Sequence, residues 1–239
     1  MPQSKLALIA GLLGALAIFD MAMGPALIHL GWVSPMFGFV WLFGLGLLEG
    51  LVGLFLGLLA LRTTRAGSGV SGRGYAVAGV ACGLVTLVVL GASAAPSGDL
   101  PSINDITTDL ADPPTFASDP AERGRDMSYP AEFVEQVRAA YPDLAPKAVD
   151  AEPARTLELA EATAQKLGWE VVRVDTAAGT VLARERTSIF LFVDDVLIRV
   201  RPGSPNGAIL DLRSKSRDGR GDLGANAARI RRFFDAFPG

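Results

Sequence analysis

A cluster of polar and charged side chains near residue 220 is the strongest candidate for a binding site. Its members are Ser214, Ser216, Arg217, Arg220, Asp222, Asn226 and Arg229. We expect a strand end, a glycine-bearing loop and a helix N-terminus to converge there. Helix N-termini favour anions, and arginines add forked donors. The cluster therefore predicts a site for a phosphate or a carboxylate, such as a lipid headgroup. In the alternative interpretation, Asp222 caps the helix and the arginines form structural ion pairs with acids.

Two smaller groups carry carboxylates that are candidates for chemistry. Thr107, Thr108 and Asp109 bring hydroxyls beside a carboxylate, which suits either catalysis or a side-chain turn cap. Asp194 and Asp195 are candidates for an acid–base pair or a weak Ca²⁺ contact. Because neighbours in a strand point to opposite faces, we interpret this pair as turn residues.

The scarcity of histidine and cysteine excludes several kinds of site. The only cysteine is Cys82 and the only histidine is His29. A disulfide framework, a cysteine zinc cluster and a Ser-His-Asp triad in the C-terminal part are therefore excluded. We predict no catalytic residue, no metal and no cofactor. The alternative is a carboxylate-dependent envelope hydrolase or transferase, whose bases come from Asp, Glu, Tyr or Lys.

The N-terminal part of the chain has the composition of a membrane domain. Apolar residues make up 50% of the 239 residues and charged residues only 20%. Long apolar stretches cover residues 6–30, 37–61 and 75–93. At ~1.5 Å per residue each stretch is long enough to cross a ~30 Å hydrocarbon core. Because a backbone at that depth must satisfy its own hydrogen bonds, residues 1–95 are predicted to form three transmembrane helices.

The basic residues of the loops predict the orientation of these helices. Arg62, Arg65 and Arg73 flank the loop between the second and third stretches, which we therefore expect to be cytoplasmic. The N-terminus is then cytoplasmic as well. The C-terminal domain is predicted to be periplasmic, in a multi-pass protein of a bacterial inner membrane. The first stretch also resembles a cleavable signal peptide, and its removal would leave the same topology.

Small residues and two acids distinguish the membrane part. A stripe of glycines on the second stretch lets another helix approach closely. We favour a three-helix bundle within one chain; the alternative is a homo-oligomer or an envelope protein partner that binds this stripe. Asp20 and Glu49 lie near mid-span, and we interpret them as protonated structural groups; the alternative is a small proton-coupled transporter. The glycines are Gly46, Gly50, Gly53 and Gly57.

The rest of the chain divides into a linker and a globular domain. Residues 96–130 are acidic and rich in proline, so we predict an extended extracytoplasmic strap. Residues 131–239 are predicted to form an α+β domain in which helices cover an antiparallel four-strand meander. The expected helices are 131–141, 152–167 and 223–237, and the expected strands are 169–175, 180–186, 196–201 and 208–216. A domain outside the cytoplasm is a poor candidate for binding nucleic acid.

Several segments of the outer domain match a known pattern. They are INDITTD (Ile103–Asp109), the pair Pro113-Pro114, FVDDVLIRVRP (Phe192–Pro202) and RSKSRDGRGDLGANAARIRRF (Arg213–Phe233). The sequence resembles the bacterial family called domain of unknown function 1499 over about residues 100–237. The three predicted spans that precede this region resemble those of the membrane-anchored members of the family. The resemblance implies a fold and boundaries but no activity. We therefore expect an integral membrane protein whose non-catalytic domain binds a partner protein or an anionic lipid headgroup.

Overall fold

The chain forms two compact units. The structure, a computed structural model, describes residues 1–94, 100–116, 127–203 and 205–238. One unit contains Met1–Gly98 together with Ser188–Leu191, and the other contains Asp99–Thr187 together with Phe192–Gly239. Residues 96–99 and 117–126 of the predicted strap lie outside the described residues. Each unit is described below by itself.

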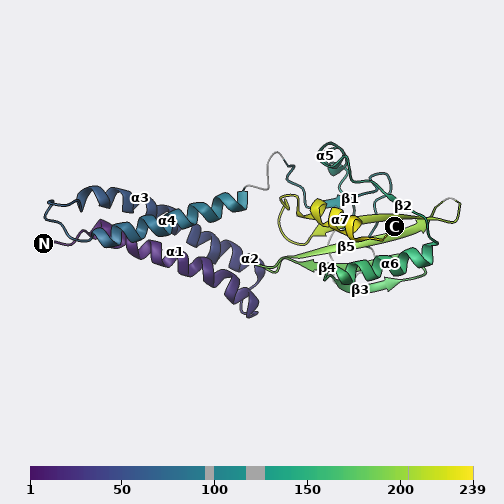
Figure 1. The fold of residues 1–239 in the computed structure, drawn as a ribbon, viewed down its shortest axis with the longest axis horizontal. Helices are drawn as coiled ribbons and strands as arrows, with labels where there is room; N and C mark the ends of the chain where they lie inside the picture. The colour runs from purple at the N-terminus through teal and green to yellow at the C-terminus, as the bar shows by residue number, and fades with distance from the viewer. Residues whose placement is uncertain (95–99, 117–126, 204, 239) are drawn as a thin grey trace. The chain divides into compact units, whose positions relative to one another are not determined.

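The first unit is built from three long apolar helices (Figure 1). Helix α1 (Lys5–His29) begins at Ser4, whose side chain accepts a hydrogen bond from the backbone N–H of Ala7. The second helix is continuous through α2 (Pro35–Phe37), the π-helical segment η1 (Gly38–Phe43) and α3 (Gly44–Thr63). The third helix is α4 (Arg73–Ala94). The stretches Lys5–His29, Pro35–Thr63 and Arg73–Ala92 are long and apolar enough to cross a membrane, which confirms the predicted class of this part.

The glycine stripe of α3 lies at the contacts between helices inside the bundle. Gly46, Gly50, Gly53 and Gly57 are all buried. A Cβ atom on Gly53 would lie 3.1 Å from the backbone nitrogen of Gly14 in α1, and one on Gly57 would lie 2.8 Å from a carbonyl of α4. The stripe therefore packs against both neighbouring helices of the same chain, as helices with small residues at their contacts do.

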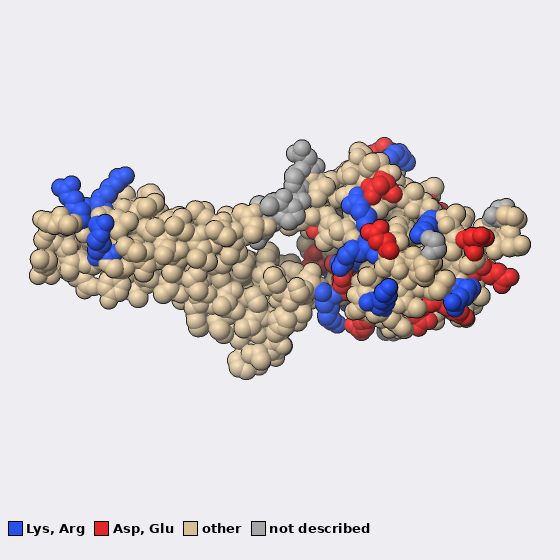
Figure 2. Space-filling model, in the orientation of Figure 1, with Lys and Arg blue, Asp and Glu red and all other residues tan. Residues whose placement is uncertain are grey.

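The basic residues of this unit gather at one end (Figure 2). Ser4 donates its backbone N–H to the carbonyl of Ser71 over 3.0 Å, which joins the N-terminal segment to the loop before α4. In the same loop region the guanidinium of Arg73 donates to the carbonyl of Leu61 over 3.3 Å. The N-terminus and the α3–α4 loop therefore lie on the same side of the bundle.

The two acids of the bundle lie on different helices. Asp20 belongs to α1 and Glu49 to α3. Their interpretation as protonated structural groups stays a prediction.

The second unit is a six-stranded antiparallel sheet with helices on one face (Figure 1). The strands run in the order β1-β6-β5-β4-β3, and β2 pairs with another part of β6. The covering helices are α5 (Phe133–Ala140), α6 (Pro153–Lys166) and α7 (Ala225–Ala236). The strands are β1 (Asp105–Thr107), β2 (Lys147–Val149), β3 (Glu170–Asp175), β4 (Thr180–Arg186), β5 (Val193–Pro202) and β6 (Ala208–Ser216).

The predicted α+β class is confirmed, but the predicted number of four strands was wrong. The two additional strands, β1 and β2, are three residues long and both pair with β6. A strand of that length shows no alternation of apolar and polar residues, so no sequence pattern marks it. The four expected strands form the meander β3-β4-β5-β6.

The two faces of the sheet bury different chemistry. The face toward α6 and α7 carries the main apolar core, in which Val196 and Ile198 of β5 and Leu212 of β6 are fully buried. The opposite face has a small apolar cluster around Leu197 and Phe116. Beside that cluster the second face carries charged side chains, which the strap covers.

The close packing of α3 and α4 predicts a selective response to added methyl groups. A Cβ atom on Gly83 of α4 would lie 2.6 Å from the carbonyl oxygen of Gly50, whereas one on Gly91 of the same helix meets nothing within 4 Å. We expect Gly83→Ala to destabilise the bundle by about 1–3 kcal/mol through overpacking. Gly91→Ala is the matched control and should be neutral or slightly stabilising. Unfolding of the full chain in mixed detergent micelles, followed by circular dichroism, measures both, and equal stability of the two variants would contradict the packing.

Candidate functional site

The strap-covered face of the sheet is organised around one buried ion pair. The side chains of Arg213 in β6 and Asp105 in β1 are both 0% exposed. Arg213 donates from Nε to Asp105 Oδ1 over 2.9 Å and from Nη2 to Asp105 Oδ2 over 2.7 Å. Lys215 adds a third donor to the same carboxylate at 2.9 Å. This forked geometry satisfies a carboxylate that burial would otherwise make very unfavourable.

The guanidinium of Arg213 also contacts strap residues on both sides of the segment 117–126. Arg213 donates to the carbonyl of Pro114 over 2.8 Å and to the carbonyl of Ser128 over 3.2 Å. Its carbon Cζ lies 5.0 Å from the ring centre of Phe116 and 5.2 Å from that of Tyr129. Burial, together with the negative charge of Asp105, raises the pKa of the Tyr129 hydroxyl. One side chain therefore links β6 to strap residues before and after the segment 117–126.

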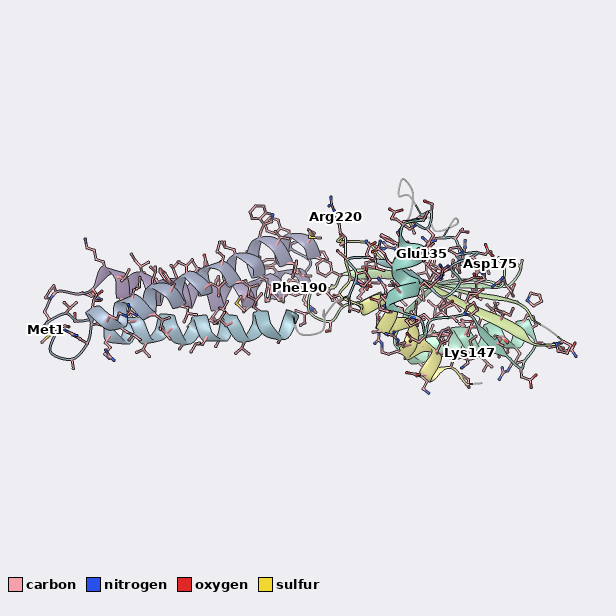
Figure 3. All side chains as sticks on the ribbon, turned by 90° about the horizontal axis from the view of Figure 1, so that it is seen from above. Met1, Glu135, Lys147, Asp175, Phe190 and Arg220 are labelled. Atoms are coloured by element: carbon pink, nitrogen blue, oxygen red, sulfur yellow. The ribbon has the colours of Figure 1, made fainter. Side chains whose placement is uncertain are left out.

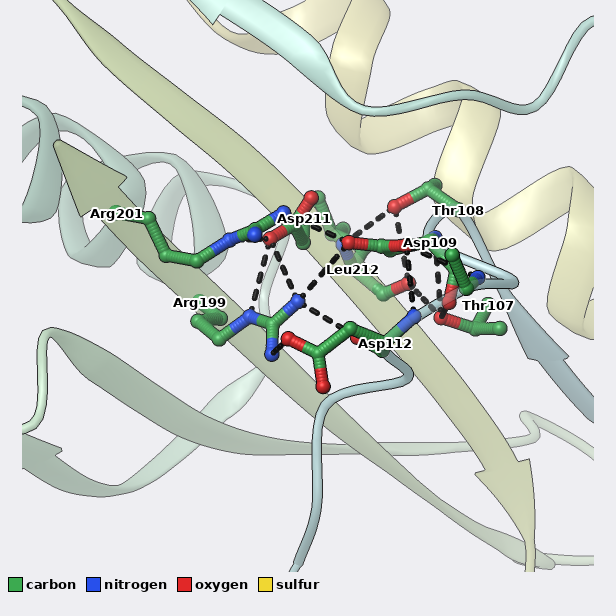
Figure 4. Close-up of polar contacts among 9 residues, drawn as sticks. Thr107, Thr108, Asp109, Asp112, Arg199, Arg201, Asp211 and Leu212 are labelled. Carbon is green, nitrogen blue, oxygen red and sulfur yellow. Dashed lines mark hydrogen bonds and ion pairs between the residues drawn. The ribbon is translucent and has the colours of Figure 1, made fainter. Parts of the chain in front are cut away.

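A second charged group lies on the same face and uses one of the predicted strap residues (Figure 4). Asp109 accepts from Arg201 over 2.7 Å and from Arg199 over 3.2 Å. The same two arginines bind Asp211 of β6 at 2.8 and 3.0 Å. Arg199 also donates to the carboxylate of Asp112 over 2.9 Å. Two arginines of β5 thus bridge strap carboxylates to a buried carboxylate of the sheet.

The threonines of the strap signature attach this turn to β6. Thr108 donates its backbone N–H to the carbonyl of Leu212 over 2.9 Å and accepts from the N–H of Leu212 at its hydroxyl over 2.9 Å. Thr107 lies in β1, with its hydroxyl 3.3 Å from the same carbonyl. Asp109 Oδ1 accepts the backbone N–H groups of Ala111 and Asp112. These contacts have the form of the side-chain turn cap considered for this triplet.

A cavity of about 260 Å³ opens beside this charged group. Its wall includes Asp112 and Arg199 together with Arg173 and Asp175 of β3. Pro113, Pro114 and Leu197 add apolar surface. The side chain of Asp112 is 69% exposed, whereas that of Arg199 is 15% exposed. The cavity therefore borders a solvent-exposed carboxylate that is bound by a largely buried guanidinium.

Four members of the predicted C-terminal cluster come together on the opposite face of the sheet, beneath α7. Ser214 donates to Asn226 Oδ1 over 2.6 Å, and Asn226 donates to Ser216 over 3.0 Å. Arg229 is 2% exposed; it donates to the Ser214 hydroxyl over 3.0 Å and forms ion pairs with Asp194 and Glu185. These four side chains use one another and buried acids as partners.

The other three members of that cluster lie apart. Arg217 is bound by Asp195 at 2.6 and 2.8 Å on the strap-covered face. Arg220 is exposed in the loop between β6 and α7. Asp222 precedes α7 and accepts the backbone N–H groups of Gly224 and Asn226, both over 2.8 Å. The two-residue alternation of β6 and the turn at Gly224 thus separate residues that are close in sequence.

The prediction of a turn at Asp194 and Asp195 was wrong, because both lie inside β5. They point to opposite faces, as strand neighbours must, and each meets arginine there: Arg229 on one face and Arg217 on the other. Burial raises the pKa of Asp194, and the charge of Arg229 opposes that rise. Acids in a strand are tolerated at these positions because each has a cationic partner.

Sequence patterns singled out Asp109, Asp195 and Arg217 of the strap-covered face but not Arg199, Arg201 and Asp211, nor the pair of Arg213 and Asp105. Charges at alternate positions of a strand are typical of a solvent-exposed face. The available signal is their complementarity: in the β5–β6 register Arg199 faces Asp211, and in the β4–β5 register Arg184 faces Asp195. Among the residues that the structure describes, no group of three or more His, Cys, Asp or Glu side chains is arranged to hold a metal ion.

The buried pair predicts a large and asymmetric cost of substitution. Arg213→Ala leaves Asp105 without its forked partner in the interior, so we expect a loss of about 3–5 kcal/mol in the free energy of unfolding. Replacing both residues by apolar ones, as in Arg213→Met with Asp105→Leu, should cost less than Arg213→Ala alone. Arg220→Ala, at an exposed position, should stay within about 0.5 kcal/mol of the wild type. Urea unfolding of the full chain in detergent, read by pulse proteolysis, compares the three.

The acid beneath α7 predicts a pH dependence. Burial raises the pKa of Glu185, but the charges and hydrogen bonds of Arg229 and Arg232 more than offset it, so the pKa is lowered. Its stabilising contribution is therefore present above the unfolded pKa of about 4.3 and is lost as the pH falls through the folded value. We expect Glu185→Gln to cost roughly 1–2 kcal/mol at pH 7 and to approach the wild type as the pH falls through the lowered pKa of the folded state. A stability difference that does not change with pH would contradict the pairing.

The comparisons with known proteins agree with this domain. No curated protein matches the chain. The model of the family described as "Protein of unknown function (DUF1499)" matches residues 105–237, which begin at β1 with Asp105 and include the whole sheet. The match covers more than half of the chain and contains both charged groups of the strap-covered face. The three helices that precede the matched residues are long and apolar enough to cross a membrane. The chain therefore belongs to the DUF1499 family.

Proposed function

We propose that this protein is a membrane-anchored binding protein whose C-terminal domain receives an anionic group in the cavity beside Arg199. The sequence predicted a partner protein or an anionic lipid headgroup as the ligand, and both share this chemistry. The observation that carries the proposal is the ion pair between Arg199 and Asp112 at the wall of the cavity. The guanidinium nitrogen lies 2.9 Å from the carboxylate oxygen, and the side chain of Asp112 is much more exposed than that of Arg199.

Exchange of one anion for another is the chemistry that this pair supports. The guanidinium of Arg199 also donates to the carboxylates of Asp211 and Asp109, over 3.0 and 3.2 Å. These contacts keep the guanidinium in position when the carboxylate of Asp112 turns away from it. A carboxylate or phosphate of a ligand then takes the oxygen position of Asp112. When the ligand group is a carboxylate, it brings the same charge to Arg199 as the carboxylate of Asp112 that it replaces. The exchange therefore adds no buried charge that the domain would have to stabilise.

The cavity wall suits a small group better than a long chain. Arg173 adds a second cation and Thr180 a hydroxyl, while Pro113 and Leu197 offer apolar contact. A volume of about 260 Å³ is close to the lower limit of ligand cavities, ~300 Å³. The proposed ligand is therefore a small anion or the anionic end of a larger molecule.

The proposed location is the extracytoplasmic side of a bacterial inner membrane. Support comes from the basic residues that gather at the end of the bundle holding the N-terminus and the α3–α4 loop (Figure 2). Positive loops stay in the cytoplasm. An odd number of spans then directs the chain after α4 to the periplasm.

Titration of the full chain in non-ionic detergent at low ionic strength, with inorganic phosphate and with succinate as probes, tests the proposal. Asp112→Asn removes the competing carboxylate, so the affinity for the anion should rise about two- to fivefold, the equivalent of an exposed ion pair. Arg199→Lys should lower the affinity, because a point charge lacks the fork.

Arg186→Gln is the matched control, since Arg186 is half-exposed on β4 and pairs with Glu170. It should leave the affinity unchanged. A weaker affinity in Asp112→Asn would mean that the acid itself binds the ligand, and would overturn the exchange. Phosphate without succinate binding would point to a headgroup, and the reverse to an acidic partner.

A further inference from the structure

Asn206 differs from the other asparagines of the chain in its neighbour along the sequence and in its surroundings. The chain has three asparagines, Asn104, Asn206 and Asn226, and only Asn206 is followed directly by a glycine. Asn206 is exposed to solvent and Gly207 is partly exposed. The amide side chain of Asn206 and the backbone after it are therefore open to water.

Asn206 lies in the loop between β5 and β6, at one end of the sheet. The β5–β6 register ends with Pro202 opposite Ala208, and the β3–β4 turn, which Asp175 precedes, lies at the same end. Figure 3 shows Asp175 well away from Arg220, which belongs to the loop at the other end of β6. The loop of Asn206 therefore shares no contact with the β6–α7 region.

Hydrogen bonds restrain the other two asparagines. The side-chain amide of Asn104 donates to the carbonyl of Gly219 over 2.7 Å. Asn226 is 0% exposed, accepts from Ser214 over 2.6 Å and donates to Ser216 over 3.0 Å. Both side chains would have to break these contacts before they could react with the backbone.

Asn206 has neither restraint, and its backbone is strained. Within the described part of the chain, no hydrogen bond involves the side chain of Asn206 or the backbone N–H of Gly207, although the carbonyl of Gly207 accepts from Gly203 over 2.8 Å. The φ of Asn206 is 114°, in a region that residues with a side chain rarely adopt. Such strain raises the energy of the loop, so a reaction that relaxes this backbone is favoured.

These features favour attack of the backbone on the amide. The nitrogen of Gly207 forms a bond to Cγ of Asn206 and gives up its proton, and the side-chain nitrogen leaves as ammonia. Water then opens the cyclic imide at one of its two carbonyls, which yields aspartate or isoaspartate. Glycine favours the attack because no side chain shields its nitrogen.

We propose that Asn206 is a site of spontaneous deamidation in the folded protein, and that the isoaspartate product loosens the pairing of β2 with β6. A Cβ atom on Gly207 would lie 2.7 Å from the carbonyl oxygen of Val149, so the loop packs closely against β2. Val149 faces Ala208, the first residue of β6. Isoaspartate lengthens the main chain two residues before Ala208, and pairing register depends on loop length.

Comparison of folded and unfolded protein tests whether the structure leaves Asn206 reactive. The full chain in detergent is incubated in mildly alkaline buffer with and without guanidinium chloride, and peptide mass spectrometry follows the conversion of each asparagine to an acid. The rate at Asn206 should be similar in the two samples, whereas Asn104 and Asn226 should react several-fold more slowly in the folded one. A rate at Asn206 that the fold suppresses as strongly as that at Asn226 overturns the proposal.

Hydrogen exchange tests the effect on β2. Asn206→Gln is the matched variant, because it keeps the amide but would have to close a larger, less favourable ring. During the same incubation without denaturant, exchange in the peptide that contains Lys147–Val149 should become faster in the wild type and stay constant in Asn206→Gln. Unchanged exchange in wild-type protein whose Asn206 has been converted overturns the loosening of β2.

Discussion

The buried pair of Arg213 and Asp105 is the interaction on which the C-terminal domain depends. A guanidinium and a carboxylate without exposed surface are stable only if every strong donor and acceptor finds a partner. That requirement holds β1 beside β6, and it draws the carbonyls of Pro114 and Ser128 toward the same side chain. The described strap residues 100–116 and 127–130 are therefore part of the domain, and the family match likewise begins at Asp105.

The charges on the two sides of the sheet have different consequences. Beneath α7, Arg229 pairs with Asp194 and Glu185 inside a closed, helix-covered site, which favours a structural role for the serines and asparagine around it. Under the strap, Arg199 is shared between buried acids and the solvated Asp112. Only the second arrangement combines a fixed cation with a counter-ion that can leave, which is what a binding site for an anion needs.

Sequence patterns predicted the elements with long periodicities and missed features set by tertiary pairing. The apolar stretches and the meander strands have enough residues to show their period, whereas β1 and β2 have three each. Asp194 and Asp195 suggested a turn because neighbours in a strand point to opposite faces and cannot act as one pair. The strand is possible because an arginine faces each of them, Arg229 on one face and Arg217 on the other. The strap signature Thr107–Asp109 could be recognised, but its arginine partners Arg199 and Arg201 could not, since alternating charges usually face water.

The pairing of β1 with β6 has a consequence for synthesis of the protein. Asp105 leaves the ribosome more than a hundred residues before Arg213, and β1 has no partner strand until β6 exists. Contacts between such distant positions form late and slow the folding of a domain. The acidic, proline-rich segment that contains β1 must therefore stay unpaired until almost all of the domain has been made. Charged residues and prolines disfavour strand pairing, so the composition of that segment opposes incorrect pairing of β1 before β6 has been synthesised.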